Sequence, residues 1–213
     1  MLTKIIFAVL SLCTAGMISA ASINFDDIDA SAGDINLDTI NPYQGLNWTN
    51  FSAYTTTPGF PGFNNGIVSF DNAAYSGGEL LGAIITPVVG KIESAGPFDF
   101  VSAYLGAGYY DNLSLTVEGR LHGSLLFTQS VILNTTTPLL VNFGFTNIDE
   151  LDFIASTTLS TTDPFLCGAV NCTQFTLDDL VYISSPVPEP SGMMFVGLTL
   201  IAAIAIRRRI NLG

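Results

Sequence analysis

The sequence predicts an all-β fold, a two-sheet antiparallel β-sandwich of the jelly-roll type. Across residues 22–185, no amphipathic pattern with the period of an α-helix continues for three turns. Short segments of alternating apolar and polar residues occur instead, bounded by clusters of Gly, Pro, Asn, Asp and Thr. These segments predict about eight to ten strands, which is typical of jelly rolls.

The first half of this stretch predicts short strands between long loops. The strands are expected at 23–27, at 43–51, which contains the single tryptophan Trp48, and at 66–70. Segments rich in Gly, Pro, Thr or other small residues predict loops at 30–37, 53–65 and 73–82.

The second half alternates more regularly. Residues 113–121 and 124–133 predict a hairpin, because His122 and Gly123 between them can form a tight turn with positive φ. Further strands are predicted at 98–105, 139–145, 151–155 and 174–184, and a loop at 157–173.

Both ends of the chain have the pattern of targeting segments. Lys4, the apolar residues 5–12 and the small residues 19–21 predict a signal peptide at 1–21 that is cleaved after Ala20 or Ala21. A distinct tail occupies 186–213. The stretch between them, 22–185, is long enough for one domain with its own core.

The tail has three parts in a fixed order. The apolar run, residues 192–206, is close to the length that spans a bilayer and predicts a transmembrane helix. The three arginines after this run predict that the C-terminal end of the helix lies in the cytoplasm. An ordinary single-pass anchor is the alternative interpretation. The three parts are a Pro-Glu-Pro motif (Val187, Pro188, Glu189 and Pro190), the apolar run 192–206 and an arginine cluster (Arg207, Arg208 and Arg209).

This tail resembles the PEP-CTERM sorting signal of Gram-negative bacteria that make extracellular polysaccharide. The resemblance covers residues 187–213 and includes Ser191 and the Gly197-Leu198 pair. The chain departs from the family pattern only in the residues 210–213 that follow the arginines. The resemblance implies recognition by an exosortase, transient anchoring in the inner membrane, cleavage near the Pro-Glu-Pro motif, and delivery to the cell surface or extracellular matrix.

The body also resembles a group of exported domains that look like jelly-roll carbohydrate-binding modules. The similarity lies in a Gly-Leu-Asn-Trp element at 45–48 and a Phe-x-x-Asp-x-Leu element at 175–180. Fold similarity of this kind does not establish a function.

The chain is strongly acidic. Eighteen Asp and Glu residues against six Lys and Arg residues give a net charge of −12, and Lys91 and Arg120 are the only cations at 22–185. Such a surface repels phosphate backbones, so nucleic-acid binding is not expected. The acidity can keep an exported protein soluble, or it can hold divalent cations.

Two cysteines, Cys167 and Cys172, remain after removal of the signal peptide and have only four residues between them. An exported chain meets an oxidising compartment, so we expect a local disulfide between them.

Acidic residues on the apolar phase of the first and last predicted strands suggest a structural calcium site. Asp27 shares a phase with Ile23, and Asp179 shares one with the apolar residues of 174–184. Buried carboxylates need a partner, and calcium prefers oxygen ligands. We expect Asp27 and Asp179 as ligands, with Asp26 and Asp178 as further candidates. A bulge or a strand end that places these side chains in water is the alternative.

Aromatic residues beside asparagines in loop-like sequence suggest a surface that stacks on sugars; burial in the core is the alternative. The candidates are Tyr43, Trp48, Tyr54, Tyr109 and Tyr110.

Catalysis is not expected. His122, the only histidine, falls at a predicted turn and should be exposed, and no nucleophile-elbow motif is present. The sequence therefore predicts a structural or adhesive protein of the surface or biofilm matrix that contacts polysaccharide. A carbohydrate-binding module with a defined ligand is the first alternative, and a glycoside-active enzyme is the second.

Overall fold

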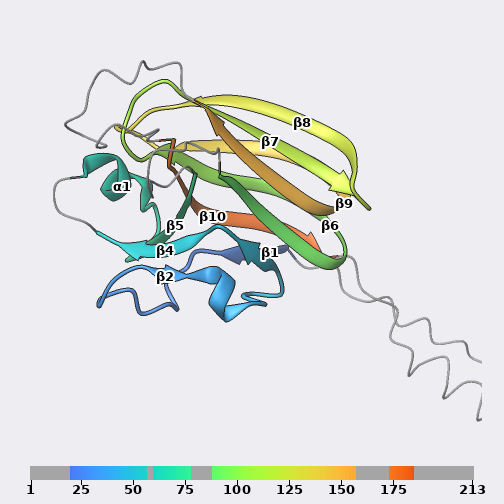
Figure 1. Ribbon diagram of the computed structural model, residues 1–213, viewed down its shortest axis with the longest axis horizontal. Helices are drawn as coiled ribbons and strands as arrows, with labels where there is room; N and C mark the ends of the chain where they lie inside the picture. The colour runs from blue at the N-terminus through green and yellow to red at the C-terminus, as the bar shows by residue number, and fades with distance from the viewer. Residues whose placement is uncertain (1–19, 57–59, 78–87, 157–172, 185–213) are drawn as a thin grey trace, which may run out of the picture. The chain divides into compact units, whose positions relative to one another are not determined.

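The computed structural model describes residues 20–56, 60–77, 88–156 and 173–184, all of which belong to one compact unit, Ile18–Ser185. These residues form antiparallel strands with very little helix, so the all-β prediction is confirmed (Figure 1). The helices are η1 (Leu37–Ile40) and α1 (Pro61–Gly66). The strands are β1 (Ala20–Ile23), β2 (Ile35–Asn36), β3 (Asn47–Thr49), β4 (Ser52–Thr55), β5 (Asn72–Ser76), β6 (Val89–Ala107), β7 (Leu113–Leu121), β8 (Ser124–Leu133), β9 (Leu139–Ser156) and β10 (Phe175–Ser184).

All of these strands belong to one hydrogen-bonded sheet. Their order is β2-β4-β5-β10-β6-β9-β7-β8, with β1 added to β10 and β3 added to β6. The structure therefore does not divide the strands into the two separate sheets that the sequence predicted.

Strands β6 and β9, of 19 and 18 residues, pair with each other and are the longest of the described strands. Their pairing is interrupted by register shifts between Glu93 and Ser102 of β6. Up to Glu93, β6 has β3 on its other side, and from Phe98 onward it has β10. Because bulges bend strands, the two halves of the β6–β9 pair can lie in differently oriented parts of the sheet.

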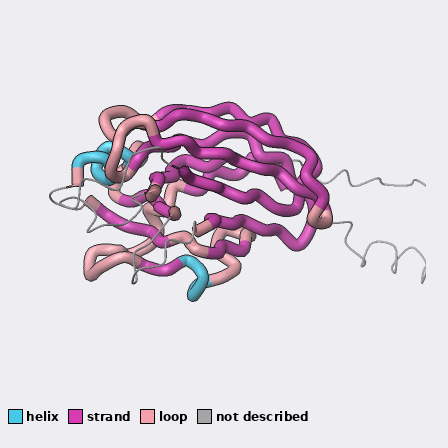
Figure 2. The backbone as a smooth tube through the Cα atoms, turned by 45° about the horizontal axis from the view of Figure 1, so that its top comes forward, coloured by secondary structure: helices cyan, strands magenta, loops and turns pink. Residues whose placement is uncertain are grey.

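The strands curve so that parts of the sheet lie over one another (Figure 2), and the first half of β9 contacts β8 through its side chains. Phe145 of β9 stacks on Phe127 of β8 with ring centroids 5.0 Å apart. Gly119 of β7 makes room for this contact, because a Cβ there would lie 2.8 Å from the Phe145 ring. Strands of a single sheet thus lie on both sides of the core.

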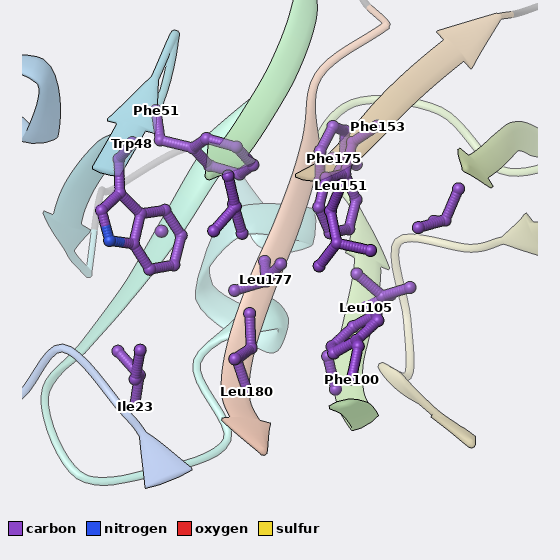
Figure 3. Close-up of a cluster of buried hydrophobic side chains, with 14 of the residues drawn as sticks. Ile23, Trp48, Phe51, Phe100, Leu105, Leu151, Phe153, Phe175, Leu177 and Leu180 are labelled. Carbon is purple, nitrogen blue, oxygen red and sulfur yellow. The ribbon is translucent and has the colours of Figure 1, made fainter. Parts of the chain in front are cut away.

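Aromatic side chains fill the centre of that core (Figure 3). Phe51, between β3 and β4, is 1% exposed and makes edge-on contacts with Trp48, Phe153 and Phe175 at centroid distances of 5.3, 5.7 and 6.0 Å. Phe153 of β9 and Phe175 of β10 stack on each other, 5.7 Å apart. Phe51 therefore joins the N-terminal strands to the long strands.

Several predicted boundaries in the first half were wrong. The first strand is β1 and ends at Ile23, and the strand expected at 66–70 is instead the end of α1 followed by a loop. The loops expected at 53–65 and 73–82 contain most of β4, most of α1 and most of β5. Ala73 and Ala74 of β5 are both buried, so this strand shows no alternation that would reveal it.

The second half was predicted better. The hairpin of β7 and β8 is confirmed, with His122 and Gly123 at φ 50° and 76°. The strands expected at 139–145 and 151–155 are one continuous strand, β9. No helix among the described residues is long and apolar enough to span a bilayer. The signal peptide up to residue 19, the disulfide residues Cys167 and Cys172, and the whole tail from 186 lie outside the described residues.

A matched pair of substitutions tests the role of Phe51. Phe51→Ala should lower the free energy of unfolding by about 3–5 kcal/mol, because it opens a cavity among three aromatic rings. Phe70→Ala, at a residue that is 91% exposed, should change it by less than about 0.5 kcal/mol. Urea unfolding of both variants measures the difference; equal effects would contradict this description of the core.

Candidate functional site: carboxylates at the strand ends

A bulge in β10 changes the side of the sheet on which its side chains lie. The register with β6 shifts between Asp178 and Val181, and Asp179 adopts a φ of 46°. After the bulge Leu180 and Tyr182 are buried instead of Val181 and Ile183. The prediction that Asp179 shares the apolar phase of the whole strand was therefore wrong, and the alternative of a bulge is what the structure shows.

Asp178 is the carboxylate that the fold buries completely. It accepts hydrogen bonds from the backbone amides of Val68 and Ser69, at 2.7 and 2.9 Å, and from the amide of Asp179 at 2.7 Å. The Ser69 hydroxyl donates to it as well, at 3.1 Å. Asp178 thus ties the loop after α1 to β10.

The environment of Asp178 favours its protonated form. Burial raises the pKa of Asp178 to about 6, although hydrogen bonds from the amides of Ser69, Val68 and Asp179 act in the opposite direction. Loss of hydration therefore outweighs the donors that the loop supplies.

Asp26 holds the other end of the same loop. One of its carboxylate oxygens accepts from the amides of Asp71 and Asn72, at 3.0 and 3.2 Å. Its Oδ2 is buried and has no hydrogen-bond partner among the described residues. The pKa of Asp179 is raised by burial and by the charge of Asp26, so these two carboxylates are electrostatic neighbours.

Asp27 has hydrogen-bond partners of its own. The chain leaves β1 after Ile23, and Phe25 has a φ of 64°, so the alternation that placed Asp27 on the apolar phase ends before it. Asp27 is exposed and accepts from the hydroxyl of Tyr43 at 2.5 Å and from Gln44 at 2.9 Å. In the described part of the chain, no three Asp, Glu, His or Cys side chains come together as metal ligands.

The aromatic residues expected to stack on sugars are largely interior. Trp48, Tyr54 and Tyr43 are 0%, 1% and 8% exposed, so their ring faces are not available to a sugar. The Trp48 indole donates to the carbonyl of Tyr43, and the Tyr54 hydroxyl donates to that of Phe63. The core alternative therefore holds for these three.

Tyr109 and Tyr110 are partly exposed. Tyr109 packs edge-on against Phe60 and Phe63, at 5.5 and 5.1 Å. Their predicted contact with sugar stays a prediction.

A charged network that sequence reasoning missed crosses β6, β9 and β7. Lys91 binds Glu150 at 2.8 Å, and Arg120 binds Asp152 at 2.8 Å and also contacts Glu118. In the sequence, Glu118 and Arg120 are two residues apart, as are Glu150 and Asp152, which indicates that each pair shares one face of a strand. The sequence did not show which strands are paired, so the network could not be predicted. Both cations of the body are thus engaged with strand carboxylates.

His122 lies where the sequence predicted, at the turn between β7 and β8. Its side chain is 80% exposed, and its Nδ1 is 2.8 Å from Asp149. An exposed turn residue of this kind has no neighbouring nucleophile to activate among its described contacts.

Comparison with known proteins identifies the tail. Residues 186–209 match the model of the PEP-CTERM protein-sorting motif. The chain therefore carries this motif, which implies an exported protein that is sorted by an exosortase and transiently anchored in a membrane. The search of curated proteins found no significant match.

Two solved structures resemble the body only distantly. The K2 cleaved adhesin domain of Lys-gingipain has 9% identity and a TM-score of 0.45 over 78% of this chain and 100% of that one. The enzymatically active domain of tailspike protein 4 from bacteriophage CBA120 has 7% identity and a TM-score of 0.31 over 64% of this chain and 18% of that one.

The buried carboxylate makes stability depend on pH. Because the folded-state pKa of Asp178 is raised, folding takes up a proton, so its contribution to stability is largest below about pH 4 and is lost as the pH rises through about 6. Relative to Asp178→Asn, the wild type should gain about 2 kcal/mol between pH 6.5 and 4. Urea unfolding of both proteins across this range measures the difference. A difference that does not vary with pH would contradict the raised pKa.

Proposed function

We propose that this chain is a structural or adhesive protein of the cell surface or extracellular matrix, delivered there by an exosortase. The match of residues 186–209 to the PEP-CTERM sorting motif carries the proposal. The motif acts on proteins in transit through the membrane, so the body is the part that works outside. In this proposal the tail is removed near Pro188 and Pro190, and the body contacts polysaccharide of the matrix.

A structural role fits the way the body uses its polar residues. Asp178 and Asp26 bind backbone amides of a loop, and Lys91 and Arg120 bind carboxylates of neighbouring strands. These side chains serve the fold. The proposal is accordingly non-enzymatic, and a carbohydrate-binding module with a defined ligand remains the alternative.

Intact mass of the protein from its host tests the sorting step. Wild type recovered from the cell surface and medium should lack the signal peptide and everything after the Pro-Glu-Pro motif. Replacement of Pro188, Glu189 and Pro190 by alanine should leave a chain that retains Arg207–Arg209 and stays in the membrane fraction. Asn211→Ala, outside the matched residues, is the control and should be processed normally.

Either of two results would overturn the sorting proposal: a wild-type mass that includes the arginines, or normal processing of the triple-alanine variant. The matrix role is tested separately with the same samples. Processed protein that co-sediments with matrix polysaccharide supports the role, and tight binding to a single glycan on an array favours the module instead.

We also propose calcium binding, now with Asp26 and Asp179 as its centre. The support is the buried Asp26 oxygen that has no hydrogen-bond partner among the described residues, together with the effect of the Asp26 charge, which raises the pKa of Asp179. Calcium should raise the melting temperature by roughly 2–4 °C or more, and EDTA should reverse this. Asp179→Asn should abolish the response, whereas Asp38→Asn, at an exposed residue of η1, should preserve it. No heat of binding in calorimetry and no effect of EDTA would exclude the site.

A further inference from the structure

Strand β8 forms one border of the sheet (Figure 1). It is ten residues long and pairs with β7, and no described strand lies on its other side. The opposite border, β2, has only two residues. A long free border presents a row of backbone donors and acceptors that another strand can pair with, and most proteins shorten or charge such borders.

The composition of β8 leaves this border unprotected. Ser124–Leu133 contains no Asp, Glu, Lys, Arg, Pro or Gly. On its outward face Leu126 and Ile132 are 48% and 55% exposed. The one irregularity is a bulge at Leu126, because Gly119 pairs with Phe127 and Arg120 pairs with Leu125. The rest is a regular, uncharged strand of high β-propensity.

The sequence of β8 suits pairing with itself. In an antiparallel pair centred on Gln129, Leu126 lies opposite Ile132 of the second copy, and Thr128 lies opposite Ser130. Leu126 and Ile132 of each copy would then cover each other on one face, while Leu125, which is 49% exposed, lies outside this contact. A two-fold axis at Gln129 makes both halves of this contact equivalent, as in closed dimers.

The distribution of charge also favours association of two copies at the β8 border. A net charge of −12 repels a second copy over most of the surface. Glu118 and Arg120 lie on β7, opposite Thr128 and Leu125 of β8. In a continuous sheet β7 of one copy would be three strand spacings, about 14 Å, from β7 of the other. This exceeds the Debye length of about 8 Å at physiological salt, so repulsion there is largely screened.

We propose that β8 is a homotypic docking edge, through which two copies of this chain join their sheets in antiparallel fashion around Gln129. The inference is independent of the proposed matrix role, because it rests on the border, composition and charge of β8. A paired edge would also shield β8 from indiscriminate strand addition.

Charge substitutions at the facing positions test the pair. Leu126→Glu with Ile132→Glu places like charges opposite each other twice and should weaken dimerisation roughly tenfold or more. Leu126→Lys with Ile132→Glu places opposite charges there and should restore it. Leu139→Glu with Leu140→Glu changes two leucines of similar exposure, 45% each, on β9 and is the matched control. Sedimentation of the full-length chain in detergent micelles measures the dimer fraction, with circular dichroism and melting temperature confirming folding.

The outcomes separate clearly. Dimers in the wild type and the control, loss in the double-Glu variant and recovery in the Lys/Glu variant support the proposal. A monomeric wild type overturns it, as does a dimer that the double-Glu variant leaves intact, because the tail alone would then account for association. Loss without recovery in the Lys/Glu variant overturns the pairing around Gln129. Amide exchange in β8 that slows with protein concentration gives an independent check on folded wild type.

Discussion

The bend of the β6–β9 pair is the constraint on which the rest of this structure depends. An extended pair of 18 or 19 residues would leave one face of the sheet open to water. The shifts between Glu93 and Ser102 turn the pair instead, so β7 and β8 meet the first half of β9 across a core. Burial of the aromatic rings around Phe51 then provides the main stabilisation of the closed arrangement.

An acidic chain with few cations cannot give every buried carboxylate a Lys or Arg partner, so some carboxylates need other hydrogen-bond donors. Lys91 and Arg120 are used on the strands β6 and β7, next to Glu150 and Asp152. Asp178 and Asp26 rely on backbone amides of the loop between α1 and β5, which are donors available in any sequence. The loop is thereby fixed at both ends, at the cost of a carboxylate with a raised pKa at Asp178.

The acidic body and the sorting tail have different effects on association between copies of the chain. Negative charge keeps an exported domain soluble and apart from its copies. The sorting motif at 186–209 implies transient anchoring of the chain at a membrane, and anchoring confines copies of the domain to one surface. An uncharged border such as β8 would then gain importance, because proximity raises the effective concentration of one copy for another.

The sequence by itself determined the targeting of this protein, its all-β class and the β7–β8 hairpin, because each depends on neighbouring residues. Motif order defines the tail, alternation defines long half-buried strands, and His122-Gly123 defines a tight turn. Tertiary structure decided the rest. The bulge at Asp179 reversed which side chains of β10 are buried, and β5 became a strand because both of its faces are covered. Trp48 is buried in the main core and Tyr54 in a second cluster with Phe63 and Ala73, and local sequence could not distinguish either residue from a sugar-binding surface. Burial and strand pairing depend on segments far apart in the chain, so local patterns could not predict them.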